Sequence, residues 1–429
     1  MKKWLLGLMM LVFVLALAAC NSNDESDGNE TDGNNNQNEQ TEDENTNNDA
    51  SGEKTVIKFA AQNDNTPATQ KVIDAFNNSQ DKYVVEWVEM TNDSAQMHDQ
   101  LLNSLSSESS EYDVISMDVV WAGEFAGAGF LEPIDMMMDE AGLKADDFNQ
   151  GSMVSGNYKG IQYTLPFFPD LGLLYFRSDI VSEEDAQKLI SGDYTYEDLA
   201  AMAEKYTGEN DTKYGFVYQS NQYEGLTVNL AEFTDQFSNI EEGLQTMYEY
   251  TAADWTPENI LTFTEGETHT AFENGDAVFA RNWPYMYGRI MNPETEATVT
   301  PEQVGIAPLP NGGAVGGWLL GISKFSENKE GAWEFLSFLA GEEGQKIMST
   351  EGGYLPGYTP LMDNEEVLGS NDLLSFEGFQ NALNSTIARP VSSNYSETSD
   401  TIQINAHKYL SSGSGLEEAV QAIEEALAE

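Results

Sequence analysis

The fold is indicated first by residues 54–90, KTVIKFAAQNDNTPATQKVIDAFNNSQDKYVVEWVEM. The runs at 54–60 and 83–90 are short and rich in β-branched and aromatic residues, a composition typical of strands. Between the two runs, apolar residues recur at helical spacing, at Ala68, Val72 and Phe76. The stretch therefore predicts a strand, a helix and a second strand in succession.

The alternation of strands and helices continues beyond residue 90. A helix is expected over 94–105, and a strand over 112–117 that ends at Asp118. At the start of the first helix, Thr66 is expected to be the N-cap and Pro67 the first helical residue. Strands separated by helices predict a parallel sheet with helices on both faces. Ligands of such sheets bind beyond the carboxyl ends of the strands, so Asp118 is a candidate binding residue.

Later segments are built in the same way. The apolar residues of 330–340 and of the last helical pattern, which contains Ala419, Val420, Ile423 and Leu427, recur at helical spacing. Breaks rich in proline and glycine occur at 165–172, 305–317 and 352–360, where the chain can cross between lobes. We therefore predict an α/β fold of two lobes with a ligand cleft between them and several hinge crossings. The expected bounds are 54–165 plus 319–354 for the first lobe, and 166–318 plus 355–429 for the second.

The N-terminus is typical of an export sequence. Lys2 and Lys3 precede an apolar stretch that is short for a membrane span, and small residues follow it. The sequence LAAC, residues 17–20, resembles the cleavage box of bacterial lipoproteins, which predicts a signal peptide over 1–19 and a lipidated Cys20. An uncleaved helical anchor is the alternative. Cys20 is the only cysteine, so a disulfide framework is excluded.

Residues 21–53 consist almost entirely of Asn, Asp, Glu, Ser, Thr, Gly and Gln. Such a segment buries too little apolar surface to offset the entropy of ordering it, so residues 20–53 are expected to form a lipidated, disordered acidic tether. We expect the folded remainder to be a monomer on the outer face of the cell membrane, anchored by lipid alone.

The net charge of the chain is −54, from 19 basic and 73 acidic residues. This charge repels phosphate backbones and anionic lipid headgroups, which argues against nucleic-acid binding. The acidic residues are scattered rather than clustered, so solubility in a salty or alkaline medium explains them better than cation binding does.

The sequence offers little support for an enzyme. The three histidines lie far apart, and patterns such as HExxH, GxSxG, GxGxxG and the P-loop do not occur. We expect no metal, no cofactor and no catalytic residue. A glycoside hydrolase that uses a carboxylate pair remains an alternative, because 73 acidic residues guarantee some pairs by chance.

Three short stretches instead combine aromatic, glycine and polar residues. These are YTLPFFPD at 163–170, RNWPYMY at 281–287 and VGGW at 315–318. Sugars have apolar C–H faces and rims of hydroxyl groups, so a sugar site needs flat aromatic platforms beside hydrogen-bonding side chains. The co-occurrence of the three stretches predicts a sugar-binding site. A solute-binding protein for a peptide or a polyamine is a further alternative.

The chain resembles the trehalose/maltose-binding proteins of bacterial and archaeal ABC importers over nearly all of 54–429. The matching stretches are YDVISMDVVWAGEFAGAGFLEPID (112–135), LPFFPDLGLLYFRSDI (165–180), GFVYQSNQYEGL (215–226), FENGDAVFARNWPYMYG (272–288), VGIAPLP (304–310), GGWLLGISKFSENKEGAWEFLSFL (316–339) and ARP (388–390). The resemblance implies a periplasmic-binding-protein-like fold, a disaccharide such as trehalose or maltose as the ligand, and delivery to membrane permease subunits.

The resemblance also implies roles for individual residues. Carboxylates from the two lobes would bind sugar hydroxyls, aromatic rings would stack on the sugar, two glycines would offer backbone groups, and an arginine would donate hydrogen bonds. In that order, these residues are Asp118 and Asp170, then Trp283, Tyr285 and Trp318, then Gly316 and Gly317, and finally Arg389.

The sequence departs from the family pattern at three places. Phe168 stands where a tyrosine is common, and Leu319 and Leu320 after Trp318 are less polar than in relatives. Where the family can present a glutamate after the first strand, this chain offers Asp64 or Asn65. The disaccharide class is expected to persist, with the identity of the sugar left open.

Overall fold

The structure is a computed structural model that describes residues 54–64 and 66–428. The predicted signal peptide, Cys20, the whole of the predicted tether and Asn65 lie outside these residues. Within the described ranges, the helices are all too short or too polar to cross a membrane.

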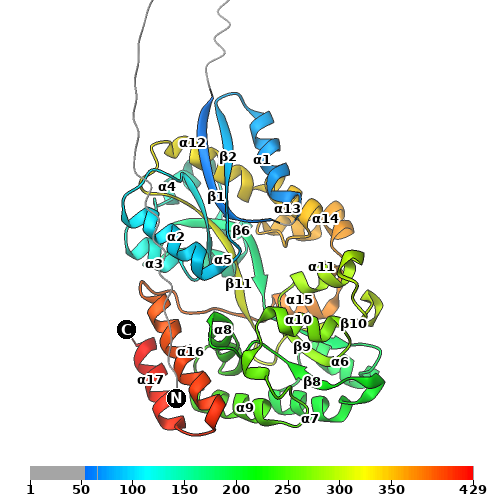
Figure 1. Cartoon of the computed structure of the whole chain (residues 1–429). Helices are drawn as coiled ribbons and strands as arrows, with labels where there is room; N and C mark the ends of the chain where they lie inside the picture. The colour runs from blue at the N-terminus through cyan, green and yellow to red at the C-terminus, as the bar shows by residue number, and fades with distance from the viewer. Residues whose placement is uncertain (1–53, 65, 429) are drawn as a thin grey trace, which may run out of the picture. The chain divides into compact units, whose positions relative to one another are not determined.

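The first lobe is built on a six-stranded sheet with the strand order β12-β11-β3-β1-β2, to which β6 is joined through β11 (Figure 1). The strands are β1 (Thr55–Gln62), β2 (Tyr83–Met90), β3 (Val114–Asp118), β6 (Thr164–Leu171), β11 (Gly313–Ile322) and β12 (Thr386–Ile387). The helices are α1 (Ala68–Ser79), α2 (Ser94–Ser106), α3 (Ala122–Gly127), α4 (Asp135–Ala141), α5 (Gln150–Ser155), α12 (Lys329–Ala340) and α13 (Glu342–Gly352). A short hairpin is formed by β4 (Asn157–Tyr158) and β5 (Ile161–Gln162).

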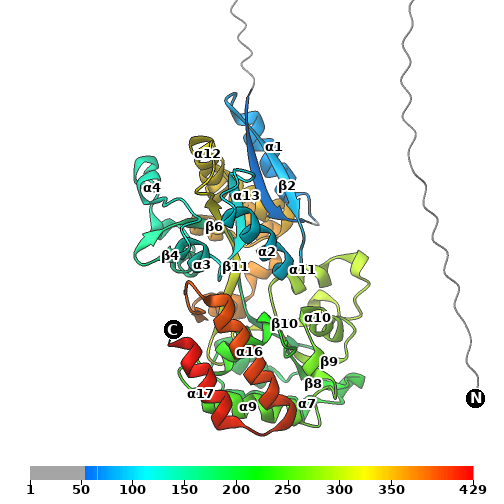
Figure 2. The ribbon, with the colours of Figure 1, turned by 60° about the vertical axis from the view of Figure 1, so that its left-hand side comes forward.

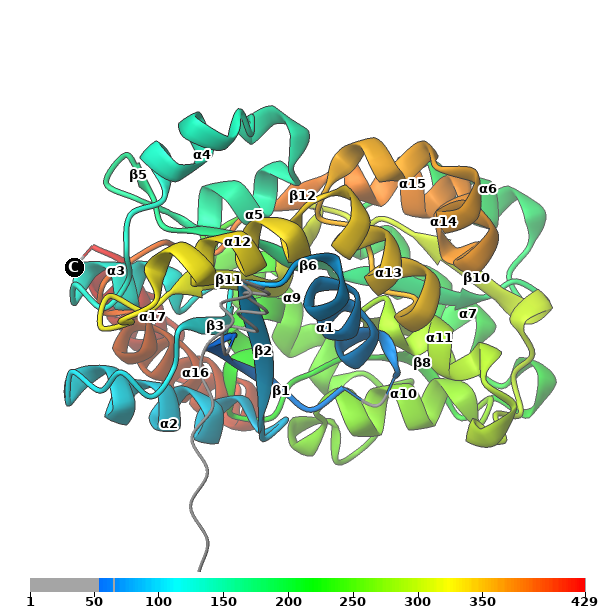
Figure 3. The same cartoon turned by 90° about the horizontal axis from the view of Figure 1, so that it is seen from above.

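Helices cover both faces of this sheet because side chains alternate along its strands. In β11, Leu320 and Ile322 pack in one cluster with α1, α12 and α13, whereas Leu319 packs in the opposite cluster with α2 and α3. The view from above shows α1, α12 and α13 grouped together (Figure 3). The prediction of a sheet covered on both faces is therefore confirmed for the first lobe.

The strand directions confirm the sequence prediction only in part. β1 pairs in parallel with both β2 and β3, as expected for strands linked by helices. However, β11 runs antiparallel to β3 and to β6, so the complete sheet is mixed. β11 returns from the second lobe, and the order of residues along the chain does not reveal that return.

The second lobe contains a four-stranded sheet with the order β10-β7-β9-β8. Its strands are β7 (Leu173–Arg177), β8 (Tyr214–Val217), β9 (Ala277–Asn282) and β10 (Val304–Ala307). The helices are α6 (Glu183–Ser191), α7 (Tyr196–Tyr206), α8 (Glu224–Phe233), α9 (Ile240–Ala252), α10 (Glu265–Glu273), α11 (Tyr285–Met291), α14 (Glu365–Ser370), α15 (Glu377–Leu383), α16 (Tyr395–Ser412) and α17 (Leu416–Leu427).

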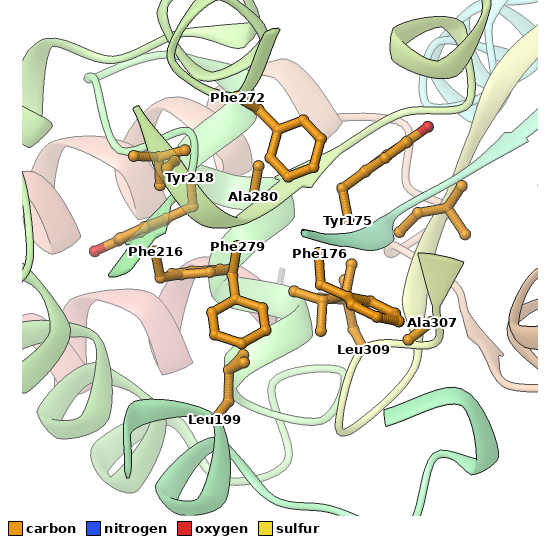
Figure 4. Packing of buried hydrophobic residues seen from close by; sticks show 14 of the residues in the cluster. Tyr175, Phe176, Leu199, Phe216, Tyr218, Phe272, Phe279, Ala280, Ala307 and Leu309 are labelled. Carbon is orange, nitrogen blue, oxygen red and sulfur yellow. The ribbon is translucent and has the colours of Figure 1, made fainter. Parts of the chain in front are cut away.

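The core of the second lobe combines many Phe and Tyr rings with aliphatic side chains. Figure 4 shows Tyr175, Phe216, Tyr218 and Phe279 among the side chains that project from its sheet. The C-terminal helices α16 and α17 lie side by side and pack against the core of this lobe (Figure 2). Tyr395, at the start of α16, instead packs in a cluster of the first lobe, a contact that the predicted lobe bounds did not include. Those bounds remain a prediction.

The chain crosses between the lobes where proline and glycine gather. β6 continues almost directly into β7, and β11 runs beside β6 in the opposite direction. A third crossing lies between Met348, in a first-lobe cluster, and Leu355, in the core of the second lobe. The predicted hinge crossings are thus present, although residues 165–171 of the first one lie in strand β6 and only Gly172 separates it from β7.

The first helix begins differently from the prediction. α1 starts at Ala68 with Pro67 as its N-cap, so the assignment of Thr66 as the N-cap and Pro67 as the first helical residue is wrong. The carboxylate of Asp64 takes over the capping. It accepts hydrogen bonds from the backbone and hydroxyl groups of Thr66 (2.8 and 2.7 Å) and of Thr69 (3.0 and 2.7 Å). The hydroxyl of Tyr354 donates a fifth bond (2.8 Å).

We expect Asp64→Ala to lower the free energy of unfolding by about 2 kcal/mol, because it removes a charged cap with several donors. Burial raises the pKa of Asp64, but the bonds from Thr66 and Thr69 outweigh burial and lower the pKa overall. The difference from wild type should therefore be full at neutral pH and shrink below about pH 4. Urea unfolding at several pH values measures it. Asp74→Ala, at an exposed position of the same helix, is the control, and equal losses from both variants would contradict the capping role.

Candidate functional site

The predicted binding residues converge on the middle of β11. In the sheet register, Trp318 is paired with Asp118 on one side and with Phe168 on the other. Gly316, two residues earlier, is paired with Asp170. Directly opposed residues of antiparallel strands lie about 5 Å apart, so β11 brings a carboxylate from β3 and a carboxylate from β6 to one place.

The two glycines of β11 each meet a steric requirement. Gly317 has φ +98°, and a Cβ there would lie 2.3 Å from the carbonyl oxygen of Phe168. The register between β6 and β11 shifts directly after it, at Trp318 and Leu319. A Cβ on Gly316 would lie 2.7 Å from the indole ring of Trp283. Gly316 therefore leaves the space into which Trp283 packs, a role distinct from the predicted one of offering backbone groups to the ligand.

Trp283 is held as a platform with one face covered. It follows the last residue of β9, and its carbonyl oxygen accepts a hydrogen bond from the hydroxyl of Tyr175 (2.9 Å). The guanidinium carbon of Arg281 lies 4.0 Å from the centre of the indole ring, in a cation–π contact. Because Arg281 occupies one face, a flat ligand has only the other face on which to stack.

Arg281 is itself fixed by a buried ion pair. Its Nε and Nη2 atoms donate to the two carboxylate oxygens of Glu232 (2.9 and 2.5 Å), and both side chains are 1% exposed. Glu232 also accepts a bond from the backbone nitrogen of Ala314 in β11 (2.9 Å). The platform is thereby tied to the strand that carries Gly316 and Trp318.

Arg389 connects residues from both lobes. Its Nη1 donates to Glu224 at the start of α8 (2.6 Å), and its Nη2 donates to the carbonyl oxygen of Val315 (3.2 Å) and lies 3.7 Å from Asp118. The hydroxyl of Tyr395 also donates to Glu224 (2.6 Å). The side chain of Arg389 is 4% exposed, yet its Nε has no hydrogen-bond partner. Buried donors are normally paired, so this unpaired N–H is an unfavourable feature of the unliganded protein.

The positions of Asp118 and Asp170 disfavour the ionised forms of their carboxyl groups. Burial raises the pKa of Asp118, although Arg389 acts in the opposite direction. Burial raises the pKa of Asp170 to about 7, and the nearby charge of Asp118 adds to the effect. Hydrogen bonds from a ligand's hydroxyl groups to the ionised carboxylates would replace the lost hydration.

Tyr354, which was not among the predicted binding residues, contacts both Phe168 and Asp64. The ring of Tyr354 stacks on Phe168 with ring centres 4.5 Å apart, and its hydroxyl bonds to Asp64. Tyr354 thus links the ring of Phe168 to the carboxylate of Asp64. Five hydrogen bonds from the protein already engage the carboxylate of Asp64. Its role as a ligand contact stays a prediction.

Tyr285 lies at the outer edge of the platform. It is 40% exposed, and its hydroxyl is 3.0 Å from Nδ1 of His269. Sequence reasoning also missed Trp121, whose ring meets that of Trp318 edge to face at 5.5 Å, and the acids Glu224 and Glu265. Glu224 falls within the matched stretch 215–226, but nothing in the sequence distinguishes it from the other acidic residues.

A cavity of about 330 Å³ lies elsewhere and is lined by Tyr158, Lys159 and the segment 390–393. It shares no residue with the set gathered on β11, so we place the candidate site at β11. Within residues 54–64 and 66–428, no group of three or more His, Cys, Asp or Glu side chains is arranged to hold a metal ion.

A known protein family matches more than half of the chain. Residues 60–346 match the family model described as bacterial extracellular solute-binding protein. The chain belongs to this family. Members bind solutes, which confirms the prediction of a non-enzymatic function, and the family description supports a location outside the cytoplasm.

Individual relatives are similar over most of their length. A probable ABC transporter-binding protein of Deinococcus radiodurans is 27% identical over 76% of this chain and 81% of its own. A maltotriose-binding protein of Pyrococcus abyssi is 27% identical over 63% and 60%, respectively. The solved structure of maltose-bound T. maritima MalE3 has 27% identity and a TM-score of 0.73, covering 87% of this chain and 99% of that one. The predicted two-lobe fold is confirmed by this similarity.

We expect Asp170→Asn to stabilise the protein in the absence of ligand. Because the pKa of Asp170 is raised in the folded state, ionisation destabilises folding increasingly between about pH 4 and pH 7. At pH 8 the variant should gain about 1–3 kcal/mol over wild type, and the gain should shrink as the pH falls toward 4. Thermal unfolding across this pH range measures it, with the exposed Asp254→Asn as control. A stability difference that does not depend on pH would contradict the account.

Proposed function

We propose that this protein binds a disaccharide of the maltose or trehalose type and delivers it to the permease of an ABC importer. The observation that carries the proposal is the convergence of Asp118, Asp170, Trp318 and Trp283 on β11. Two carboxylates near two indole rings match a neutral ligand that has apolar faces and hydroxyl rims.

The comparisons support a sugar as the solute. The MalE3 structure holds maltose, and the relative from Pyrococcus abyssi is named for maltotriose. The relative from Deinococcus radiodurans is named as an ABC transporter-binding protein, which supports transport as the purpose of binding.

The proposed mechanism is closure of the lobes around the sugar. Asp118 comes from the first lobe, Trp283 comes from the second, and Arg389 contacts residues of both. A ligand that bonds to both lobes stabilises the closed form more than the open form and shifts the hinge equilibrium. The closed monomer then docks on the permease and releases the sugar.

We expect calorimetry to show saturable binding of maltose or trehalose, with Trp283→Ala and Asp118→Ala each weakening affinity by at least about tenfold. The first variant removes the stacking surface, and the second removes a charged acceptor. Trp333→Ala, on α12 and outside the set of candidate binding residues, is the matched control and should bind like wild type. Binding of spermidine or a peptide, with no response to any saccharide, would contradict the proposal.

We further propose that Cys20 is lipidated and anchors the protein through the acidic tether, close to the permease. Tethering raises the local concentration of the binding protein near its membrane partner without any new contact. More than one acyl chain gives stable attachment. The support for the anchor is the sequence LAAC at 17–20.

We expect Cys20→Ser, expressed in a bacterium with lipoprotein processing, to shift the protein from the membrane fraction to the soluble one. Fractionation and immunoblotting measure the shift, and sugar affinity should be unchanged because Cys20 precedes the folded lobes. A variant that stays in the membrane fraction would contradict lipid anchoring at this residue.

A further inference from the structure

One carboxylate at the platform belongs to none of the predicted contacts. Glu265 is the first residue of α10, and its Oε1 lies 3.4 Å from the indole Nε1 of Trp283. Its Oε2 accepts a hydrogen bond from the hydroxyl of Tyr223 (2.7 Å). Burial, followed by the charge of Glu265, raises the pKa of both Tyr223 and Tyr285. The carboxylate therefore lies among three aromatic side chains.

Local structure fixes the position of Glu265. Thr264 is the N-cap of α10 and forms a capping box with Glu267, whose carboxylate accepts a bond from the backbone nitrogen of Thr264 (2.8 Å). The side chain of Asn282 bonds to the carbonyl oxygen of Glu265 (3.4 Å) and accepts a bond from the backbone nitrogen of Trp283 (2.8 Å). The same side chain thus holds both the acid and the platform. The first turn of a helix also favours a negative charge.

Glu265 differs from the neighbouring acids in its partners. Glu224, Glu232 and Glu273 each form an ion pair with an arginine, at 2.6, 2.5 and 2.6 Å. In the part of the chain that the structure describes, no Lys, Arg or His nitrogen lies within 4.0 Å of the Glu265 carboxylate. The hydrogen bonds to this partly buried carboxylate come from the neutral donors Tyr223 and Trp283, while Arg281 attracts it without an ion-pair contact. Such a carboxylate gains from any further donor that a ligand presents.

We propose that Glu265 is a specificity-determining residue that accepts a hydrogen bond from a hydroxyl group of the sugar ring stacked on Trp283. The proposal rests on the proposed function. An indole N–H lies in the plane of its ring, so the Glu265 carboxylate lies beside the edge of the platform. A sugar on the free face of Trp283 projects its equatorial hydroxyls outward past that edge. Glu265 then distinguishes rings by whether a hydroxyl is present at this point.

The surroundings favour a hydroxyl over a cationic group. A carboxylate flanked by aromatic rings can bind an ammonium ion. Here, however, the guanidinium of Arg281 already lies 4.0 Å from the Trp283 ring and repels a second positive charge on the same indole. A neutral hydroxyl donor satisfies the carboxylate without that repulsion.

The test combines Glu265→Gln with maltose and the series of monodeoxy maltoses, measured by calorimetry. Gln keeps the shape of the side chain and removes the charge. We expect Glu265→Gln to bind maltose about ten- to a hundredfold more weakly than wild type, with an unchanged melting temperature and near-ultraviolet dichroism. Glu258→Gln, exposed in the same lobe, should match wild type. One deoxy analogue should bind wild type weakly and show no additional loss in Glu265→Gln, because both changes remove the same hydrogen bond.

Affinity for maltose within twofold of wild type would overturn the proposal. So would losses that are additive for every deoxy analogue, or a loss accompanied by an altered tryptophan dichroism, which would mean that Glu265 acts only by positioning Trp283. Preferential binding of choline or spermidine, abolished in Glu265→Gln, would overturn it in favour of a cation site. If wild type binds no saccharide at all, the proposed function itself fails.

Discussion

The arrangement of the site depends on the buried ion pair between Glu232 and Arg281. Glu232 belongs to α8, Arg281 belongs to β9, and the carboxylate also accepts a bond from Ala314 of β11. A buried ion pair adds little net stability, because the cost of removing two charges from water offsets their attraction. Its effect here is geometric. One pair of side chains fixes a helix, a strand of the second sheet and the strand that crosses between the lobes.

The influence of the pair extends to the ligand-facing surface. Arg281 lies under Trp283, Trp283 packs against Gly316, and Gly316 is paired with Asp170. Each residue in this series constrains the next one. Removing either ionised partner would leave the other charge buried and unpaired, at a cost of about 3–5 kcal/mol. The platform, the crossing strand and one site carboxylate would then be disturbed together.

The carboxylates of the candidate site, by contrast, lower the stability of the protein without ligand. Burial raises the pKa of Asp118 and of Asp170, so their ionised forms oppose folding when no ligand is bound. The Nε of Arg389 is buried without a partner. Binding sites often keep such unfavourable groups because the ligand completes their hydrogen bonds. The ion pair and the two carboxylates are joined through β11, so the pair fixes the position of the strand along which Asp118 and Asp170 lie.

The sequence predicted elements whose pattern is local. β2 was expected over 83–90 and has those bounds, and α12 and the last helix lie where apolar residues recur. The start of α1 was wrong because the capping carboxylate, Asp64, precedes the proline and threonine that suggested a cap. The return of β11 was not predictable from spacing, since its partners are about 150 and 200 residues away in sequence.

The candidate binding residues were predicted partly from local pattern, through the strand end at Asp118 and the three aromatic stretches, and their individual roles through resemblance to a family. Asp118, Asp170, Trp283 and Trp318 stand in matching stretches, and the structure gathers all four on β11. Glu224, Glu232 and Glu265 could not be identified, because the chain has 73 acidic residues and only their three-dimensional partners distinguish them. Tyr354 was missed for the same reason, as its contact with Phe168 joins residues far apart in the chain.

A crystal structure of the protein grown with maltose tests the central claim most directly. We expect one sugar ring on the face of Trp283 opposite Arg281, with hydroxyls within hydrogen-bond distance of Asp118 and Asp170. Maltose bound in the cavity beside Tyr158, or anywhere away from β11, would contradict it.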